Sequence, residues 1–274
     1  MIYKDVKKVI DDYQFSFKKK FGQNFIIEPK IIDGIISKID IDKDTLVIEI
    51  GPGAGSLTSK LCEVADFVLC YEIDQTLKDV LNTSLKNYSN YEIIYGDFLK
   101  AKVNDDIKKY NYYKIYVVAN LPYYITTPII MKFIDDKINI QKMAFMVQKE
   151  VGNRFKASVG SKDYSSLSIF LNYYFDIQKI LDVSRNVFIP KPNVDSIVVM
   201  FTSKKDKLYV KNEELFFKLI RDSFKQKRKT IKNNLKDYDL DKIENVLLKH
   251  NLSLSSRAEQ IPDYVFADII NNYK

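Results

Sequence analysis

An Asn-Leu-Pro-Tyr tetrapeptide at positions 120–123 follows an apolar run that has the composition of a buried strand. Adenine N6, an exocyclic amine, is a poor nucleophile because its lone pair is delocalised into the ring. The side-chain oxygen of Asn120 and a backbone carbonyl, most simply that of Leu121, can each accept one amine hydrogen and turn the lone pair toward a methyl group. Pro122 stiffens the loop, and Tyr123 offers a ring for stacking on an extruded base. Alone, these residues also suit a β-turn after a strand.

Three glycines and two acidic residues have the spacing of an adenosine-binding site. Gly51, Gly53 and Gly55 follow the first strand-like run, and a backbone without Cβ atoms can approach a nucleotide closely. Glu72 ends the next apolar run about 20 residues later, where a carboxylate can accept hydrogen bonds from a ribose diol. Asp97 ends the third run and could accept a hydrogen bond from an adenine amino group. We expect Gly51, Gly53, Glu72 and Asp97 to bind a cofactor.

Two classes of enzyme share this pattern of glycines and acidic residues as far as the third apolar run. A nicotinamide-dependent dehydrogenase and an S-adenosylmethionine-dependent methyltransferase both hold adenosine at the carboxyl ends of such strands. The loop at 120–123, after the fourth run, separates them and favours methyl transfer. His250 is the single histidine, which argues against a zinc site, so we expect no metal.

A parallel sheet is needed to bring these residues together. Apolar runs alternate with amphipathic segments, which predicts repeated strand–helix units. The expected strands are 46–50, 67–71, 91–95, 115–119, 143–147, 177–183 and 195–201, with the last two as an antiparallel edge; 56–64 and 165–173 are expected helices. Thr127 and Pro128 have the residue types of a helix N-cap and first turn. From residue 207 the pattern is purely helical.

The predicted fold is therefore α/β, with a Rossmann-like class I methyltransferase sheet and a small α-helical C-terminal domain. We expect the methyltransferase domain to span residues 1–204, including a basic N-terminal arm at 1–20, and the helical domain to span 205–274. The boundary is placed where strand-forming residues give way to a polar, lysine-rich stretch.

Composition narrows the class of protein. Hydrophobic residues make up 46% and charged residues 29% of the 274 residues, as in a soluble globular protein. No stretch provides the ~20 apolar residues of a membrane span, and the charged N-terminus lacks the apolar segment of a secretory signal. Cys62 and Cys70 lie in apolar contexts without C-x-x-C spacing, which favours buried, reduced thiols. We expect a cytoplasmic monomer that contacts no membrane.

The net charge of +7 is concentrated in two segments. Residues 203–236 hold twelve Lys and Arg against four Asp and Glu, and residues 1–20 hold six Lys against three Asp. Such a local excess indicates a polyanionic partner. The expected RNA-binding residues are Lys225, Lys227, Arg228, Lys229 and Lys232. A solvated lysine-rich face would explain the charge alone equally well.

Eight segments together resemble one protein family. In chain order they read KKFGQNF, VIEIGPGAGSLT, YEID, GDFL, NLPYYITTPI, VQKEVGNRF, VFIPKPNVDSIVV and KRKTIKNNL. Over roughly residues 15–270 the chain is similar to bacterial small-subunit ribosomal RNA adenine N6,N6-dimethyltransferases. The resemblance implies an enzyme that uses S-adenosylmethionine, releases S-adenosylhomocysteine and needs no metal.

The resemblance also implies a substrate and further site residues. The substrate would be 16S rRNA in a precursor of the small ribosomal subunit, dimethylated at N6 of two adjacent adenosines in its 3′-terminal hairpin loop. The implied cofactor contacts are Asn24, Ile26, Gly51, Glu72, Asp97 and Asn120, of which the first two rest on the resemblance alone. Phe188, held extended by Pro190 and Pro192, would cover the face of the adenine opposite Tyr123.

The chain departs from the family pattern at several positions. Gly152 and Asn153 replace the usual Ala and acidic residue, Val159 stands where Pro is common, Ser165 replaces Gly, and Ile261-Pro262 replaces Leu-Ser. These changes affect the expected local shape of the 157–166 loop and the C-terminal segment, not the chemistry.

Two alternative functions remain open at this point. The first is the related large-subunit (23S) rRNA adenine methylase of the macrolide-resistance type, although the KRKTIKNNL segment and Arg257-Ala258-Glu259 fit the small-subunit family better. The second is a non-catalytic ribosome-assembly factor of the same fold. Intact Asn120, Glu72 and Asp97 argue against a loss of catalysis.

Overall fold

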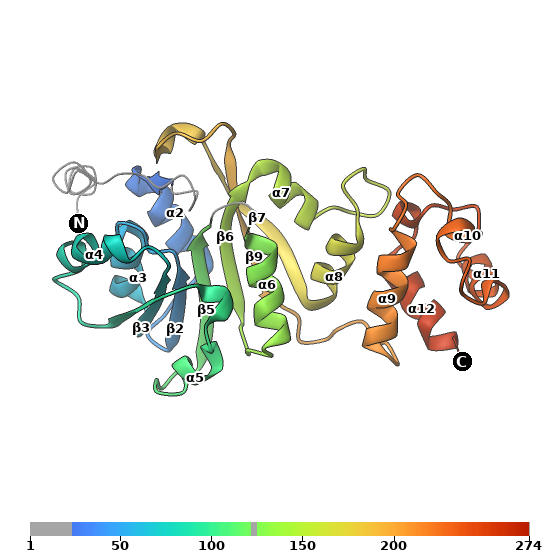
Figure 1. Ribbon diagram of the computed structural model, residues 1–274, viewed down its shortest axis with the longest axis horizontal. Helices are drawn as coiled ribbons and strands as arrows, with labels where there is room; N and C mark the ends of the chain where they lie inside the picture. The colour runs from blue at the N-terminus through green and yellow to red at the C-terminus, as the bar shows by residue number, and fades with distance from the viewer. Residues whose placement is uncertain (1–23, 122–124, 274) are drawn as a thin grey trace. The chain divides into compact units, whose positions relative to one another are not determined.

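The computed structural model describes residues 24–121 and 125–273, which contain a seven-stranded sheet with the strand order β4-β3-β2-β5-β6-β9-β7 (Figure 1). The strands are β2 (Thr45–Ile50), β3 (Phe67–Glu72), β4 (Tyr91–Tyr95), β5 (Lys114–Asn120), β6 (Lys142–Gln148), β7 (Phe175–Val183) and β9 (Ser196–Ser203). The helices that accompany them are α2 (Pro29–Ile39), α3 (Ser56–Val64), α4 (Lys78–Ser84), α5 (Val103–Ile107), α6 (Thr126–Asp135), α7 (Lys149–Phe155) and α8 (Ser166–Tyr174). The expected α/β architecture is confirmed.

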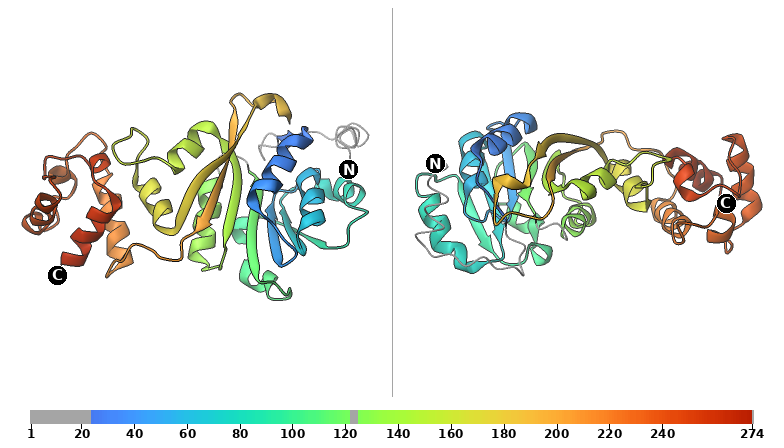
Figure 2. Two further views of the ribbon diagram at one scale, coloured as in Figure 1. Left: turned by 180° about the vertical axis from the view of Figure 1, so that it is seen from behind. Right: turned by 90° about the horizontal axis from the view of Figure 1, so that it is seen from above.

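The central strands are parallel and buried. Every residue of β2 is buried, and β2 pairs in parallel with both β3 and β5, so that Val47 lies opposite Val68 and Tyr116. Helices cover both sides of these strands (Figure 2), which is why they consist of apolar residues without polar alternation. The carboxyl ends of the parallel strands therefore meet at one edge, where Glu72 and Asn120 are the last residues of β3 and β5.

A second, two-stranded sheet joins distant parts of the chain. β1 (Phe25–Ile26) pairs antiparallel with β8 (Phe188–Ile189), placing Ile26 opposite Phe188. A further backbone hydrogen bond runs from Ile27 N to Val187 O at 2.8 Å. This pairing brings the segment that follows the N-terminal arm beside the proline-containing segment after β7.

The last two predicted strands lie side by side at one end of the main sheet, as expected. β9 pairs antiparallel with β6 over seven residues and lies between β6 and β7, so β7 is the outermost strand at this end. The inner position of β9 agrees with its burial, since Ile197, Val198 and Val199 are at most 1% exposed.

The start of α6 differs from the prediction. Its N-cap is Ile125 and the helix begins at Thr126, so Thr127 is inside the first turn instead of capping it.

The chain divides into two compact units that correct the expected domain limits. One unit contains the described residues up to Gly152 together with Gln178–Ser203, and the other contains Asn153–Ile177 together with the chain from Lys204 onward. Residues 153–177 were expected in the methyltransferase domain. They belong to the second unit because Ile169 and Tyr173 of α8 are buried in one apolar cluster with Phe216 and Ile220.

The second unit is completed by four helices: α9 (Glu213–Ser223), α10 (Ile231–Asn234), α11 (Leu240–Lys249) and α12 (Asp263–Asn272). The basic segment between α9 and α10 was expected to be helical, but residues 224–230 form turns. Asn234 accounts for the end of α9, since its Nδ2 donates to the carbonyl oxygens of Ser223 and Gln226 at 2.6 and 3.2 Å. Among the described residues, no helix is long and apolar enough to cross a membrane.

Candidate active site

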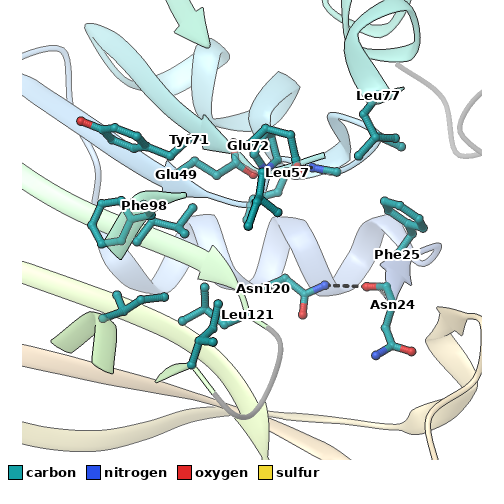
Figure 3. A pocket seen from close by; sticks show the side chains of 18 of the residues that line it. Asn24, Phe25, Glu49, Leu57, Tyr71, Glu72, Leu77, Phe98, Asn120 and Leu121 are labelled. Atoms are coloured by element: carbon teal, nitrogen blue, oxygen red, sulfur yellow. Dashed lines mark hydrogen bonds between the residues drawn. The ribbon is translucent and has the colours of Figure 1, made fainter. Parts of the chain in front are cut away.

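A cavity of about 320 Å³ lies at the carboxyl ends of β2 to β5, a volume typical of small-molecule sites (Figure 3). All the residues predicted to bind a cofactor line it: Asn24, Ile26, Gly51, Gly53, Glu72, Asp97 and Asn120. Leu121, predicted to supply a backbone acceptor, lines it as well. The predicted Pro122 and Tyr123 lie outside the described residues. Apolar side chains, including Leu57, Leu77 and Phe98, form much of the remaining wall.

The glycine turn between β2 and α3 forms one side of the cavity. Gly51 and Gly53 have φ values of 74° and 59°, in the left-handed region that side chains disfavour. A Cβ atom on Gly53 would lie 2.6 Å from Cε1 of Phe25, so the ring of Phe25 packs directly on the bare backbone. A Cβ atom on Gly51 would meet no atom within 4 Å. At Gly51 the backbone is therefore open for a ligand to approach.

Glu72 is held at the cavity wall by backbone amides. Its side chain is buried, with Oε2 accepting from Gly53 N at 3.2 Å and Oε1 accepting from Asp74 N at 2.7 Å. Burial raises the pKa of Glu72, and these amide hydrogen bonds oppose the rise. A carboxylate oxygen has more than one lone pair, so both oxygens can accept a further hydrogen bond from a ligand.

Asp97 lies just after the end of β4, and two exposed apolar side chains line the same cavity. Its Oδ1 accepts from Leu99 N at 3.0 Å and begins the 3-10 helix Phe98–Lys100. Ile73 and Leu99 also line the cavity and are 49% and 39% exposed, which is unusual for large apolar residues beside a polar site. Exposed apolar side chains next to a carboxylate suit a flat ring that carries a hydrogen-bond donor.

The orientation of the Asn120 amide is determined by its neighbour. Nδ2 of Asn120 donates to the backbone oxygen of Asn24 at 2.8 Å (Figure 3). A carbonyl can only accept, so the nitrogen of Asn120 must face Asn24 and the oxygen must face away. Within the described residues Oδ1 has no hydrogen-bond partner. The acceptor predicted for an amine is therefore presented by an element that is itself held in place.

Phe188 differs from the expectation that it covers an adenine. Its side chain is only 3% exposed and belongs to a buried apolar cluster with Ile26, Ile32 and Ile35. It is not among the residues that line the cavity. The cause is the pairing of β8 with β1, which directs Phe188 into the core beneath α2.

Glu49 is a site residue that was not predicted. It is 1% exposed, lines the cavity, and accepts a hydrogen bond from the Cys70 thiol at 3.7 Å between Oε2 and Sγ. Burial raises the pKa of Glu49 to about 8, and the nearby charge of Glu72 adds to the rise. The signal in the sequence was its position as the single acidic residue in an otherwise apolar buried strand.

The five predicted RNA-binding cations are all exposed and lie in the second unit. Lys225, Lys227, Arg228 and Lys229 are in the turns after α9, and Lys232 is in α10. None of them forms an ion pair within the part of the chain that the structure describes. By contrast, Lys218 of α9 pairs with Asp222 at 2.9 Å.

The family and the relatives that this sequence matches support a methyltransferase site in this cavity. Residues 14–274 match the family model of ribosomal RNA adenine dimethylases. Ribosomal RNA small subunit methyltransferase A from Staphylococcus aureus (strain bovine RF122 / ET3-1) is 50% identical over 239 residues, which cover 86% of this chain and 80% of that protein. The protein of the same name from strain JH9 is 50% identical over 238 residues with the same coverage.

Two solved structures are similar over most of the chain. A dimethyladenosine transferase from Plasmodium falciparum has a TM-score of 0.74 and 27% identity, covering 88% of this chain and 94% of that one. The 23S rRNA methyltransferase ErmE has a TM-score of 0.72 and 23% identity, covering 91% and 99%, and shows the shared fold. From the family match, the identity to curated relatives and the cavity described above, the chain belongs to the ribosomal RNA adenine dimethylase family.

Proposed function

We propose that this chain transfers methyl groups from S-adenosylmethionine to N6 of two adjacent adenosines in the 3′-terminal hairpin loop of 16S rRNA, within a precursor of the small ribosomal subunit. The observation that carries this proposal is the Asn120 amide, whose nitrogen is bound to Asn24 O so that its oxygen can accept. The name of the 50% identical relatives, ribosomal RNA small subunit methyltransferase A, supports the choice of RNA.

The residues around the cavity fit the proposed cofactor. The open backbone at Gly51 leaves room for close approach, and the buried carboxylate of Glu72 can accept from the two ribose hydroxyls. Asp97 can accept from the adenine amino group, and Ile73 and Leu99, which line the same cavity, can contact the ring. When bound, S-adenosylmethionine would supply an electrophilic methyl group, with S-adenosylhomocysteine as the leaving group.

The chain itself orients the nucleophile. In the first transfer, Asn120 Oδ1 and the backbone oxygen of Leu121 each accept one hydrogen of the substrate N6, so that its lone pair is directed at the methyl carbon. In the second transfer, the monomethylated N6 has one hydrogen left, and one of the two oxygens accepts it. As the new C–N bond forms, positive charge develops on N6 and strengthens these hydrogen bonds, which stabilises the transition state more than the ground state. The surplus proton is then lost to water. A strong general base is not needed before attack.

RNA binding is proposed for the exposed cations of the second unit. Lys225, Arg228, Lys229 and Lys232 are solvent-exposed side chains without ion-pair partners in the described chain. Cations of this kind release counterions when they contact phosphates, so binding should weaken steeply as salt rises.

The test is to incubate the protein with labelled S-adenosylmethionine and separated, unmethylated small and large ribosomal subunits, and then to map dimethyladenosine. We expect label at two adjacent adenosines in the small subunit only. Label in the large subunit would favour the 23S methylase alternative. A protein that binds small subunits but transfers no label would favour a non-catalytic assembly factor.

A further inference from the structure

The loop between α7 and α8 is attached to the C-terminal helices by two buried side chains. Ala157 and Tyr164 are 8% and 5% exposed and belong to the apolar core of the second unit. The Tyr164 ring packs edge-on against Phe224 with 6.0 Å between centroids, and its hydroxyl donates to Ile261 O at 3.4 Å. These contacts hold both ends of the segment 158–163 against the region that carries the basic residues.

Two hydrogen bonds fix the backbone of this segment between its ends. Gly160 N donates to Glu259 O at 2.7 Å, and Lys227 Nζ donates to Lys162 O at 2.5 Å. A tight turn, closed by Ser161 N donating to Ser158 O at 3.1 Å, shapes the loop. The segment is thus a structured extension of the second unit.

The hydrogen bond of Lys227 changes the roles expected for Lys227 and Lys162. Lys227 was predicted to face phosphates, but its ammonium group is bound to a backbone carbonyl. The same hydrogen bond places the main chain of Lys162 beside the basic segment 225–232. Lys162 is exposed and has no ion-pair partner among the described residues, in contrast to Lys242 of α11, which pairs with Asp239 at 3.2 Å.

We propose that the segment 158–163 is part of the RNA-binding surface, with Lys162 contacting a phosphate and Lys227 acting as the residue that positions it. A loop held at three points loses little conformational freedom on binding, so its single cation can contribute although it lies over 60 residues from the basic segment in sequence. This inference rests on the proposed function, because the surface it extends is the proposed RNA surface.

The first test measures binding of a small-subunit rRNA 3′-terminal fragment over a range of salt concentrations. Lys162→Gln is expected to weaken binding about two- to fivefold and to lower the slope of log affinity against log salt by about 0.7–0.9. Lys249→Gln is the matched control, since Lys249 is an exposed lysine at the end of α11. Its slope should stay at the parent value. Equal effects of the two substitutions would overturn the inference.

The second test asks whether Lys227 acts through Lys162. Lys227→Gln should weaken RNA binding less in a Lys162→Gln background than in the parent. Once the Lys162 ammonium group is gone, Lys227 no longer positions a cation. Without RNA, Lys227→Gln should also speed tryptic cleavage after Lys162 several-fold, as the loop opens more often. The Lys249→Gln control should be cleaved at the parent rate. Additive binding effects with an unchanged cleavage rate would show that Lys227 is an independent phosphate contact.

Different results would contradict the proposed function and the role of the 158–163 segment. If the parent protein neither methylates small subunits nor binds the rRNA fragment in a salt-dependent manner, the proposed function is wrong. If the parent does both while Lys162→Gln matches Lys249→Gln, only the role of the 158–163 segment is wrong.

Discussion

Asn120 combines a structural and a chemical contact in one amide group. Its nitrogen donates to Asn24 O, and its oxygen is the proposed acceptor for the substrate amine. Of these two atoms, the sequence predicted only the oxygen. The nitrogen contact joins residues 96 positions apart, and such a contact depends on the folded chain.

Replacing Asn120 by Ala should lower the single-turnover rate of methyl transfer to small subunits by about two orders of magnitude or more, as loss of one preorganised hydrogen-bond partner does. RNA affinity should be nearly unchanged, because phosphate contacts dominate it. Asn120→Asp is the informative companion: it keeps an acceptor but places a carboxylate oxygen against Asn24 O, so it should also be slow. A fully active Asn120→Ala enzyme would show that the loop is only a turn.

We expect Phe188 to contribute mainly to the stability of the fold. Because its side chain is buried with Ile26 and Ile32, Phe188→Ala should reduce the free energy of unfolding by about 3–5 kcal/mol, measured by urea denaturation. Ile189→Ala, at the half-buried neighbouring position, is the control and should cost less. If Phe188→Ala were as stable as the parent and yet defective in methyl transfer, the ring would contact the adenine, as the family resemblance implies.

At the scale of elements, strands were predicted to within a residue or two, most of them because they are apolar runs ended by a polar residue or glycine. β1 and β8 were not predicted, since a pair of two-residue strands has no periodicity and forms only through the contact between them. The turns at 224–230 were not predicted for the same reason, since they depend on a contact between residues that are distant in the sequence. The end of α9 depends on the side chain of Asn234, which lies eleven residues from Ser223.

The departure at Val159 now has a local explanation. Ser158 to Ser161 form a turn closed by Ser161 N donating to Ser158 O, and its third residue, Gly160, has a φ of 82°. This is the pattern of a type II turn, in which Pro is favoured at the second position, here occupied by Val159. The turn itself is therefore retained without the family's usual proline.

Val159→Pro should raise the free energy of unfolding by about 0.4–1 kcal/mol, because it restricts the unfolded chain at a position already suited to proline. The Val159 side chain is 44% exposed, so its loss costs little packing. Val159→Ala removes the same side chain without restricting the backbone and should bring no gain in thermal or urea denaturation. A destabilised proline variant would contradict the turn type.

At the scale of the whole molecule, Glu49 makes stability depend on pH. Its folded pKa of about 8 lies above the ordinary value of 4.5, so between these values the unfolded chain releases a proton that the folded protein keeps. The free energy of unfolding should then fall as pH rises through this window, by up to about 1.4 kcal/mol per pH unit, and level off above pH 8.

Glu49→Gln removes this titration but keeps the shape of the side chain. The stability difference between variant and parent should be small near pH 4.5 and grow in favour of the variant up to about pH 8. Urea denaturation at several pH values measures it, and Glu72, whose pKa is also raised, is present in both proteins. Parallel profiles for the two proteins would mean that Glu49 is ionised in the folded state.

The order of elements along the chain could not predict which segments make up the second unit. Residues 153–177 lie between β6 and the greater part of β7, so their place in the chain indicates the first unit. The burial of Ile169 and Tyr173 assigns them to the second. Their apolar side chains show that they are buried, but not against which partner.

This shared core limits how the protein can be divided. A fragment beginning at residue 205 would carry α9 to α12 but lack α8, and would expose the faces of Phe216 and Phe217 that pack on Tyr173. Genetic exchange of the C-terminal region at that point would leave two incomplete cores. The helical region and the segment 153–177 therefore form one structural module, which the chain between residues 178 and 203 interrupts.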